Sequence, residues 1–234
     1  MDAIVKLTYI IVPGEDEKKD MADGYKMEYI GQGYMLTSPT AIPQVCSEIS
    51  HMGQLAVENL EKSMNALLAK DHKAALEVFE TEQYIDFMNK EITNFLVKAN
   101  ELSLPVEDRK RLGALFHVVS DIERIGDHAE NIAEDVEKLI DMNENFSDPA
   151  NAEIKEMCER TVEVVRMSLK MFDEDDDQYV DEIVRLEDSV DIMERELQDL
   201  HVKRLQTGEC KAAPGMMFSD LVSNLERVAD HATN

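Results

Sequence analysis

The feature that most constrains the fold is a helical pattern that occurs twice in the chain. Asp121-Ile-Glu-Arg-Ile-Gly-Asp-His-Ala-Glu-Asn131 matches Asn224-Leu-Glu-Arg-Val-Ala-Asp-His-Ala-Thr-Asn234 at an offset of 103 residues. Upstream, Glu82-Gln-Tyr-Ile-Asp86 matches Glu187-Asp-Ser-Val-Asp191 at an offset of 105 residues. Offsets that differ by two predict the same helical hairpin twice, with a loop two residues shorter in the second copy.

Helical periodicity extends over most of the chain. From about residue 43 onward, apolar residues recur at spacings of three and four, the period of an amphipathic helix. Asp71 and Ser147 have the positions of helix N-caps, and Pro149 suits an early helical position. Six helices are expected, at about residues 43–68, 72–102, 105–145, 148–172, 179–205 and 215–234. The predicted fold class is all-α, with tandem three-helix bundles at residues 43–146 and 147–234, the last helix being truncated.

The charge balance argues against some partners. The chain has 50 Asp and Glu residues against 24 Lys and Arg residues, a net charge of −26. Nucleic-acid binding needs basic surface and is therefore disfavoured, whereas cations are attracted. The three cysteines are scattered and form no CxxC motif, which indicates reduced thiols in a cytosolic setting.

Four Glu-x-x-x-Asp pairs fall at equivalent positions of the two repeats. Residues four apart lie on one helix face, so the two carboxylates of a pair repel each other. A divalent or trivalent cation would offset this repulsion, and facing helices can each supply a pair of ligands. The alternative is a solvated face, but that gives no reason to repeat Glu-Arg-x-x-Asp-His. The candidate metal ligands are Glu123, Asp127, Glu226, Asp230, Glu82, Asp86, Glu187 and Asp191.

Further polar residues lie beside these pairs. His128 and His231 each follow a motif Asp, and together with Asp121 they are possible additional metal ligands. Arg124 and Arg227 each follow a motif Glu and point about 100° away around the helix. These two arginines are suited to orienting the carboxylates or attracting an anion such as phosphate.

Sequence signatures of enzymes are sparse. The chain contains no HExxH motif, no phosphate-binding Gly-rich loop and no zinc spacing of Cys and His. Di-iron carboxylate bundles use two Glu-x-x-His motifs, and this chain has one, Glu48-Ile-Ser-His51. We therefore expect a non-enzymatic protein, with a carboxylate-bridged metalloenzyme as the alternative.

The segment Glu123-Arg-Ile-Gly-Asp-His-Ala-Glu-Asn-Ile-Ala-Glu134 resembles the PhoU family, and Glu226-Arg-Val-Ala-Asp-His-Ala is a more divergent second copy. The resemblance covers about residues 43–234 and implies two tandem three-helix bundles. It further implies that the acidic motifs bind iron, zinc or other divalent ions, and that the chain restrains phosphate uptake and the signalling linked to it. Asn224 in place of Asp121 removes one possible ligand from the second copy.

The first 42 residues are expected to be a membrane-exit segment and linker. Val5-Lys-Leu-Thr-Tyr-Ile-Ile-Val-Pro-Gly14 resembles the last membrane segment of bacterial sodium/phosphate cotransporters, which carry a PhoU-like domain at the C-terminus. That resemblance implies a cytoplasmic domain of an inner-membrane protein, with the transporter's membrane domain as its partner in cis and a homodimer as a further possibility. The alternative is a free-standing cytoplasmic PhoU-type regulator.

Overall fold

The computed structural model describes residues 24–31 and 40–234, and six long α-helices make up nearly all of this part. The helices are α3 (Ala41–Ala69), α4 (His72–Asn100), α5 (Val106–Asp141), α6 (Asp148–Glu174), α7 (Val180–Thr207) and α8 (Ala212–Thr233). A single 3₁₀ turn, η1 (Asp177–Tyr179), precedes α7, and the described residues contain no strand. The predicted all-α class is confirmed.

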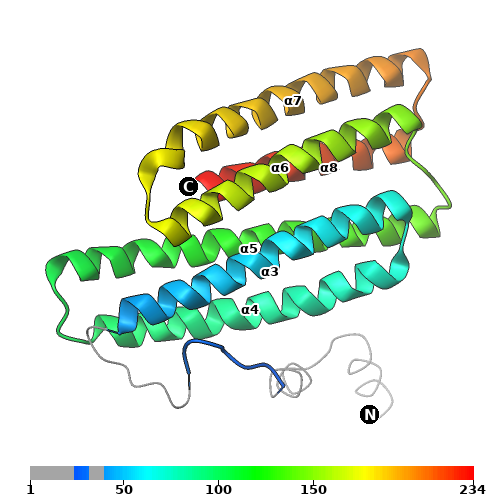
Figure 1. The fold of residues 1–234 in the computed structure, drawn as a ribbon. Helices are drawn as coiled ribbons and strands as arrows, with labels where there is room; N and C mark the ends of the chain where they lie inside the picture. Colours follow the sequence, from blue (N-terminus) through cyan, green and yellow to red (C-terminus); the bar gives the residue numbers. More distant parts are fainter. Residues whose placement is uncertain (1–23, 32–39) are drawn as a thin grey trace, which may run out of the picture.

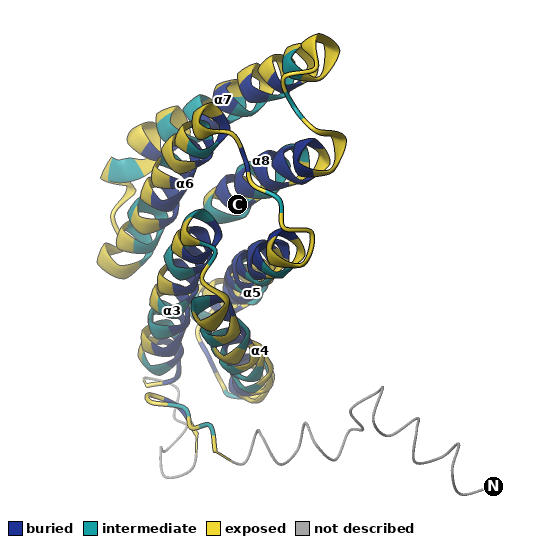
Figure 2. Cartoon of the chain, turned by 90° about the vertical axis from the view of Figure 1, so that its right-hand side faces the viewer, coloured by how far each residue is buried: buried dark blue, intermediate teal, exposed yellow. Residues whose placement is uncertain are grey.

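The helices form two three-helix units that lie side by side (Figure 1). In Figure 1 the chain crosses each unit from side to side three times, so that consecutive helices are antiparallel. The middle helices, α4 and α7, pack mainly on the helices of their own unit, whereas α3 packs on α6 and α5 packs on α8. Viewed end-on, the buried faces of both units turn inward, toward one another and toward these two contact lines (Figure 2).

Local signals explain most helix boundaries. The Asp71 carboxylate accepts hydrogen bonds from the backbone N–H groups of Lys73 and Ala74, and so caps α4 as predicted. Ser147 caps α6 through the N–H of Ala150. Helix α5 ends four residues earlier than predicted, because Asn143 adopts a left-handed conformation that reverses the chain.

Helix α8 begins three residues before the predicted start at Gly215. Glycine suggests a loop residue, yet here it is helical and sits in a close contact. A Cβ atom at position 215 would lie 2.6 Å from Cε1 of His201 on α7. Gly215 is therefore needed for the approach of α7 to α8 rather than for chain reversal.

The core consists of Ile, Leu, Val, Met and Ala side chains from all six helices. On each helix these side chains recur every three or four residues, so each helix buries one apolar face. No helix in residues 24–31 and 40–234 combines the length and the apolar character needed to cross a membrane. The expected membrane-exit segment at Val5–Gly14 lies outside the described residues.

A short segment ahead of α3, residues 24–31, is held against the first unit by one carboxylate. Glu48 on α3 is fully buried and accepts hydrogen bonds from the three backbone N–H groups of residues 28, 29 and 30, at 3.3, 2.6 and 3.1 Å. The Tyr84 hydroxyl on α4 donates to the Lys26 carbonyl at 2.8 Å. The segment is thus bound to both α3 and α4.

Candidate metal sites and the groove between the units

The structure brings the acidic pairs of α4 and α5 together. Carboxylate oxygens of Glu82, Asp127 and Glu130 all lie within 4.8 Å of one another. Asp86 and Glu123 are near enough for their charges to raise the pKa of Glu82 further. These five residues are called cluster 1 below.

The pairs of α7 and α8 meet in the same way. Carboxylate oxygens of Glu187, Asp191 and Asp230 lie within 4.8 Å of one another. Glu226 belongs to the same charge group, since the carboxylates of Asp230 and Asp191 help to raise its pKa. These four residues are called cluster 2. All eight predicted ligands therefore fall into two groups, one in each unit, although no ion is present to identify them as ligands.

Both clusters hold like charges in partly buried surroundings. Burial is the largest cause of the raised pKa values of Glu123, Asp127 and Glu130 in cluster 1, and neighbouring carboxylates add to it. The same two causes raise the pKa values of Glu187 and Glu226 in cluster 2. Each cluster therefore carries an electrostatic cost that a bound cation would remove.

Glu82 is the most unusual member. Its exposed fraction is 5%, and its carboxylate makes no hydrogen bond or ion pair with any described residue. Burial, followed by the charges of Asp86 and Glu130, raises its pKa to about 8. A glutamate this nearly buried normally has a hydrogen-bond or ionic partner, since removing most of its charge from water is costly. The oxygen donors of Glu82 and its neighbours fit a hard cation better than a soft one.

Glu130 is a cluster member that the Glu-x-x-x-Asp pattern does not predict. It lies three residues after Asp127, on the same face of α5, and this spacing is the signal that identifies it. The equivalent residue of the second repeat is Thr233. Cluster 1 therefore has one more carboxylate than cluster 2.

The three additional metal ligands predicted from the sequence lie outside the two carboxylate groups. Neither group of carboxylates within 4.8 Å includes Asp121, His128 or His231. Asp121 and His231 instead face each other between α5 and α8, with the two side-chain atoms Oδ1 and Nδ1 3.1 Å apart. The rings of His128 and His231 stack with centroids 5.8 Å apart, and burial is the main cause that lowers the pKa of His128 to about 4.

A groove of about 470 Å³ runs along the contact between α5 and α8. Its lining includes Arg124, Asp127, His128 and Asn131 from α5, together with the four residues at equivalent positions of α8. Asp127 belongs to cluster 1 and Asp230 to cluster 2. The groove therefore lies between the two clusters and has one carboxylate of each on its wall.

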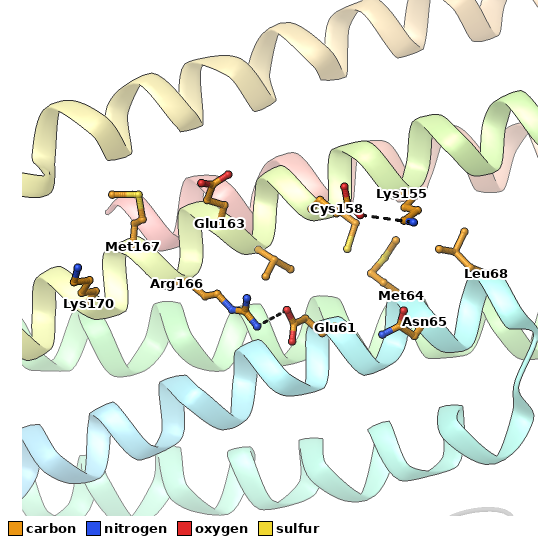
Figure 3. Close-up of a pocket in the computed structure, with 12 residues that line it drawn as sticks. Glu61, Met64, Asn65, Leu68, Lys155, Cys158, Glu163, Arg166, Met167 and Lys170 are labelled. Carbon is orange, nitrogen blue, oxygen red and sulfur yellow. Dashed lines mark ion pairs between the residues drawn. The ribbon is translucent and has the colours of Figure 1, made fainter.

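A second groove, of about 660 Å³, follows the other contact line, between α3 and α6 (Figure 3). Its wall combines apolar side chains such as Met64 and Leu68 with charged ones. Arg166 pairs with Glu61 at 2.6 Å, and Lys155 pairs with Glu159 at 3.9 Å. These two cations are therefore matched by acids of the groove itself.

Comparison with known proteins identifies relatives over most of the chain. A model of the PhoU domain matches residues 49–136 and 154–234, one match in each unit. The "Phosphate-specific transport system accessory protein PhoU homolog 1" of Thermotoga maritima is 29% identical over 189 residues, which are 80% of this chain and 81% of that protein. A PhoU homolog of the same system in Synechocystis is 29% identical over 196 residues, covering 83% of this chain and 85% of the relative.

Solved structures agree on the fold. The crystal structure of PhoU from Pseudomonas aeruginosa superimposes with a TM-score of 0.79 at 22% identity, over 85% of this chain and 94% of that one. PhoU from Streptococcus pneumoniae gives a TM-score of 0.75 at 21% identity, over 85% and 92%. At these identities the likeness establishes the arrangement of helices alone.

Proposed function

Because the chain belongs to the PhoU domain family, we propose that it is a non-enzymatic regulator of phosphate uptake that acts on a phosphate transporter. The observation that supports this role is the likeness to relatives named as accessory proteins of phosphate-specific transport systems, which extends over about four fifths of both chains. The partner is accordingly the membrane component of a phosphate transporter.

We further propose that clusters 1 and 2 bind metal ions. The observation that carries this proposal is Glu82, a nearly buried glutamate without an ion pair among the described residues, whose carboxylate lies within 4.8 Å of those of Asp127 and Glu130 and whose pKa four neighbouring acids raise. A cation placed between α4 and α5 would satisfy its oxygens and cancel the mutual repulsion. Carboxylate oxygens suit iron, manganese, magnesium or calcium, and zinc accepts them as well.

The transport role is tested in cells from which the gene for this chain has been deleted. Uptake of radiolabelled phosphate should rise in the deletion strain grown in excess phosphate, and the wild-type gene should restore the lower rate. Equal uptake in both strains would contradict a role in restraining transport.

The metal proposal is tested by elemental analysis of protein purified without a chelator. Asp127→Asn combined with Asp230→Asn should lower the bound metal, because each substitution removes a charged ligand from one cluster. The matched control is Asp141→Asn combined with Asp220→Asn, which changes exposed acids on the same two helices outside the clusters. Unchanged metal content in the first double variant would rule out these ligands.

The more specific expectation, that the chain is a domain of a sodium/phosphate cotransporter, remains a prediction. The relatives compared here are named for a different transport system, the phosphate-specific one, and are matched over most of their own length. They support a separate accessory regulator better than a cotransporter domain.

A further inference from the structure

The groove between α5 and α8 repeats one set of side chains on both walls. An Arg, an Asp, a His and an Asn from α5 line it, together with the same four residue types from α8 and its C-cap Asn234, 103 residues later. The two helices run antiparallel, so the two sets are related by an approximate two-fold axis across the groove (Figure 1). A ligand on that axis would meet the same chemical groups from both units.

The two arginines of this groove make no direct ion pair in the described part of the chain, although Arg124 acts on the charge of Asp127 and Arg227 on that of Glu226. Neither Arg124 nor Arg227 makes an ion pair or a hydrogen bond with another described residue. In a chain of net charge −26 this is unexpected, and it contrasts with Arg166 in the α3–α6 groove, which is paired with an acid. The guanidinium groups of both units are thus available on the walls of one cavity.

A buried imidazole in the same wall also has an unused nitrogen. His128 has an exposed fraction of 9%, and its Nδ1 atom has no hydrogen-bond partner. The neighbouring His231 is engaged with Asp121. His128 therefore adds to the groove wall a nearly buried imidazole whose Nδ1 atom makes no hydrogen bond within the described residues.

We propose that this groove binds a phosphoryl oxyanion, held by Arg124 and Arg227 from opposite walls. Each planar guanidinium donates two parallel hydrogen bonds to an oxyanion, so two of them favour a tetrahedral anion with four oxygens over a carboxylate with two. The cavity of about 470 Å³ is large enough for free phosphate or for the phosphate group of a larger molecule. This inference rests on the proposed role in phosphate regulation for the choice of anion.

The clusters would then control affinity for the anion. Asp127 and Asp230 lie on the groove wall and repel an anion while their charge is uncompensated. A cation in cluster 1 or 2 cancels that charge, so metal binding increases affinity for the oxyanion, and the anion increases affinity for the metal by the same factor. Metal occupancy and phosphate concentration thus both affect the same contact between α5 and α8.

The test is calorimetric titration of metal-loaded, dialysed protein with inorganic phosphate and, separately, with adenosine monophosphate. Arg124→Gln combined with Arg227→Gln should weaken binding by about tenfold or more, because both charged donors are lost. Binding of phosphate would identify a free anion as the ligand, and binding of the nucleotide alone would identify a phosphoryl group of a larger molecule. Binding of neither would overturn the proposal.

The matched control is Arg109→Gln combined with Arg185→Gln, two exposed arginines outside the groove, which should leave affinity unchanged. If phosphate binds the groove variant as tightly as wild type, it is coordinated by metal alone and the arginine site is wrong. Metal content is measured on the same samples. Loss of phosphate binding with unchanged metal content therefore separates this inference from the metal proposal.

Discussion

His231 Nδ1 lies 3.1 Å from Asp121 Oδ1, and this contact joins the last turn of α8 to the middle of α5. The equivalent pair on the other side of the approximate two-fold axis is His128 with Asn224, and Asn224 acts against the lowering of the His128 pKa. The repeat thus places one His on each helix beside an Asx residue of the other. The replacement of Asp121 by Asn224 in the second copy changes the charge of the pair but retains a hydrogen-bonding side chain.

Asp121→Ala should lower the free energy of unfolding by about 1–2 kcal/mol, because it removes a half-buried hydrogen bond between the units. Asp121→Asn should cost less, since Asn224 already occupies the equivalent place beside His128. Urea denaturation of both variants measures this difference. Asp141→Ala, at an exposed position of the same helix, is the control, and an equal loss in the control would show that the contact adds nothing.

The stability of the metal-free protein should fall as the pH rises from about 4.5 to about 8. Folding raises the pKa of Glu82 from 4.5 to about 8, so the folded state binds more protons than the unfolded chain in this interval. The free energy of unfolding therefore decreases with increasing pH. The raised pKa values of Glu123 and Asp127 act in the same direction.

This dependence is measured by urea denaturation in the presence of a chelator at a series of pH values. Glu82→Gln should make the curve flatter, because the glutamine side chain does not ionise. Glu80→Gln changes an exposed carboxylate on the same helix and should leave the slope as it is. A slope that stays the same in Glu82→Gln would mean that Glu82 ionises normally. Added metal should reverse part of the loss at high pH, since the cation stabilises the ionised form.

Most of the fold follows from periodicity and helix caps in the sequence. Asp71 and Ser147 each have a short acceptor side chain ahead of an apolar periodic segment, and both cap the predicted helix. The predicted end of α5 is four residues too late because of the left-handed Asn143, and the predicted start of α8 is three residues too late because it depends on a tertiary contact. Gly215 illustrates the reason: its small size serves the packing of His201, which no local pattern reveals.

The sites are only partly predictable for the same reason. The offsets of 103 and 105 residues pair the acidic motifs of neighbouring helices, but they do not show how far a side chain is buried. Burial of Glu82 and the inclusion of Glu130 follow from how α4 meets α5. The convergence of Arg124 and Arg227 on one groove depends on the packing of one unit against the other, and short sequence motifs carry no information about that packing.

Glu48→Ala should release the segment at residues 24–31 from the first unit. The wild-type carboxylate accepts three backbone N–H groups, and hydrogen bonds to a charged acceptor are worth about 1.5–3 kcal/mol each. Amide hydrogen exchange at Tyr29 and Ile30 should therefore become at least about tenfold faster. Glu58→Ala, at an exposed position of α3, should leave these amides protected. Equal protection in both variants would contradict the role of Glu48.

Two glycines of α5 should respond in opposite ways to substitution. A Cβ atom at Gly126 would lie 3.2 Å from Cγ2 of Ile85 on α4, whereas one at Gly113 would meet nothing within 4 Å. Gly113→Ala should stabilise the protein by up to about 1 kcal/mol, the helical preference of alanine over glycine. Gly126→Leu should destabilise it by about 1–3 kcal/mol, because α4 must move away from α5.

The displacement caused by Gly126→Leu should also reach cluster 1. Glu82 lies three residues before Ile85 on α4, so moving α4 separates its carboxylate from Asp127 and Glu130 on α5. Metal content should fall together with stability, and Ile85→Ala in the same chain should restore part of both by making room for the leucine. Thermal unfolding and elemental analysis of the single and double variants measure the two effects. Additive losses in the double variant would show that Gly126 and Ile85 are not in contact.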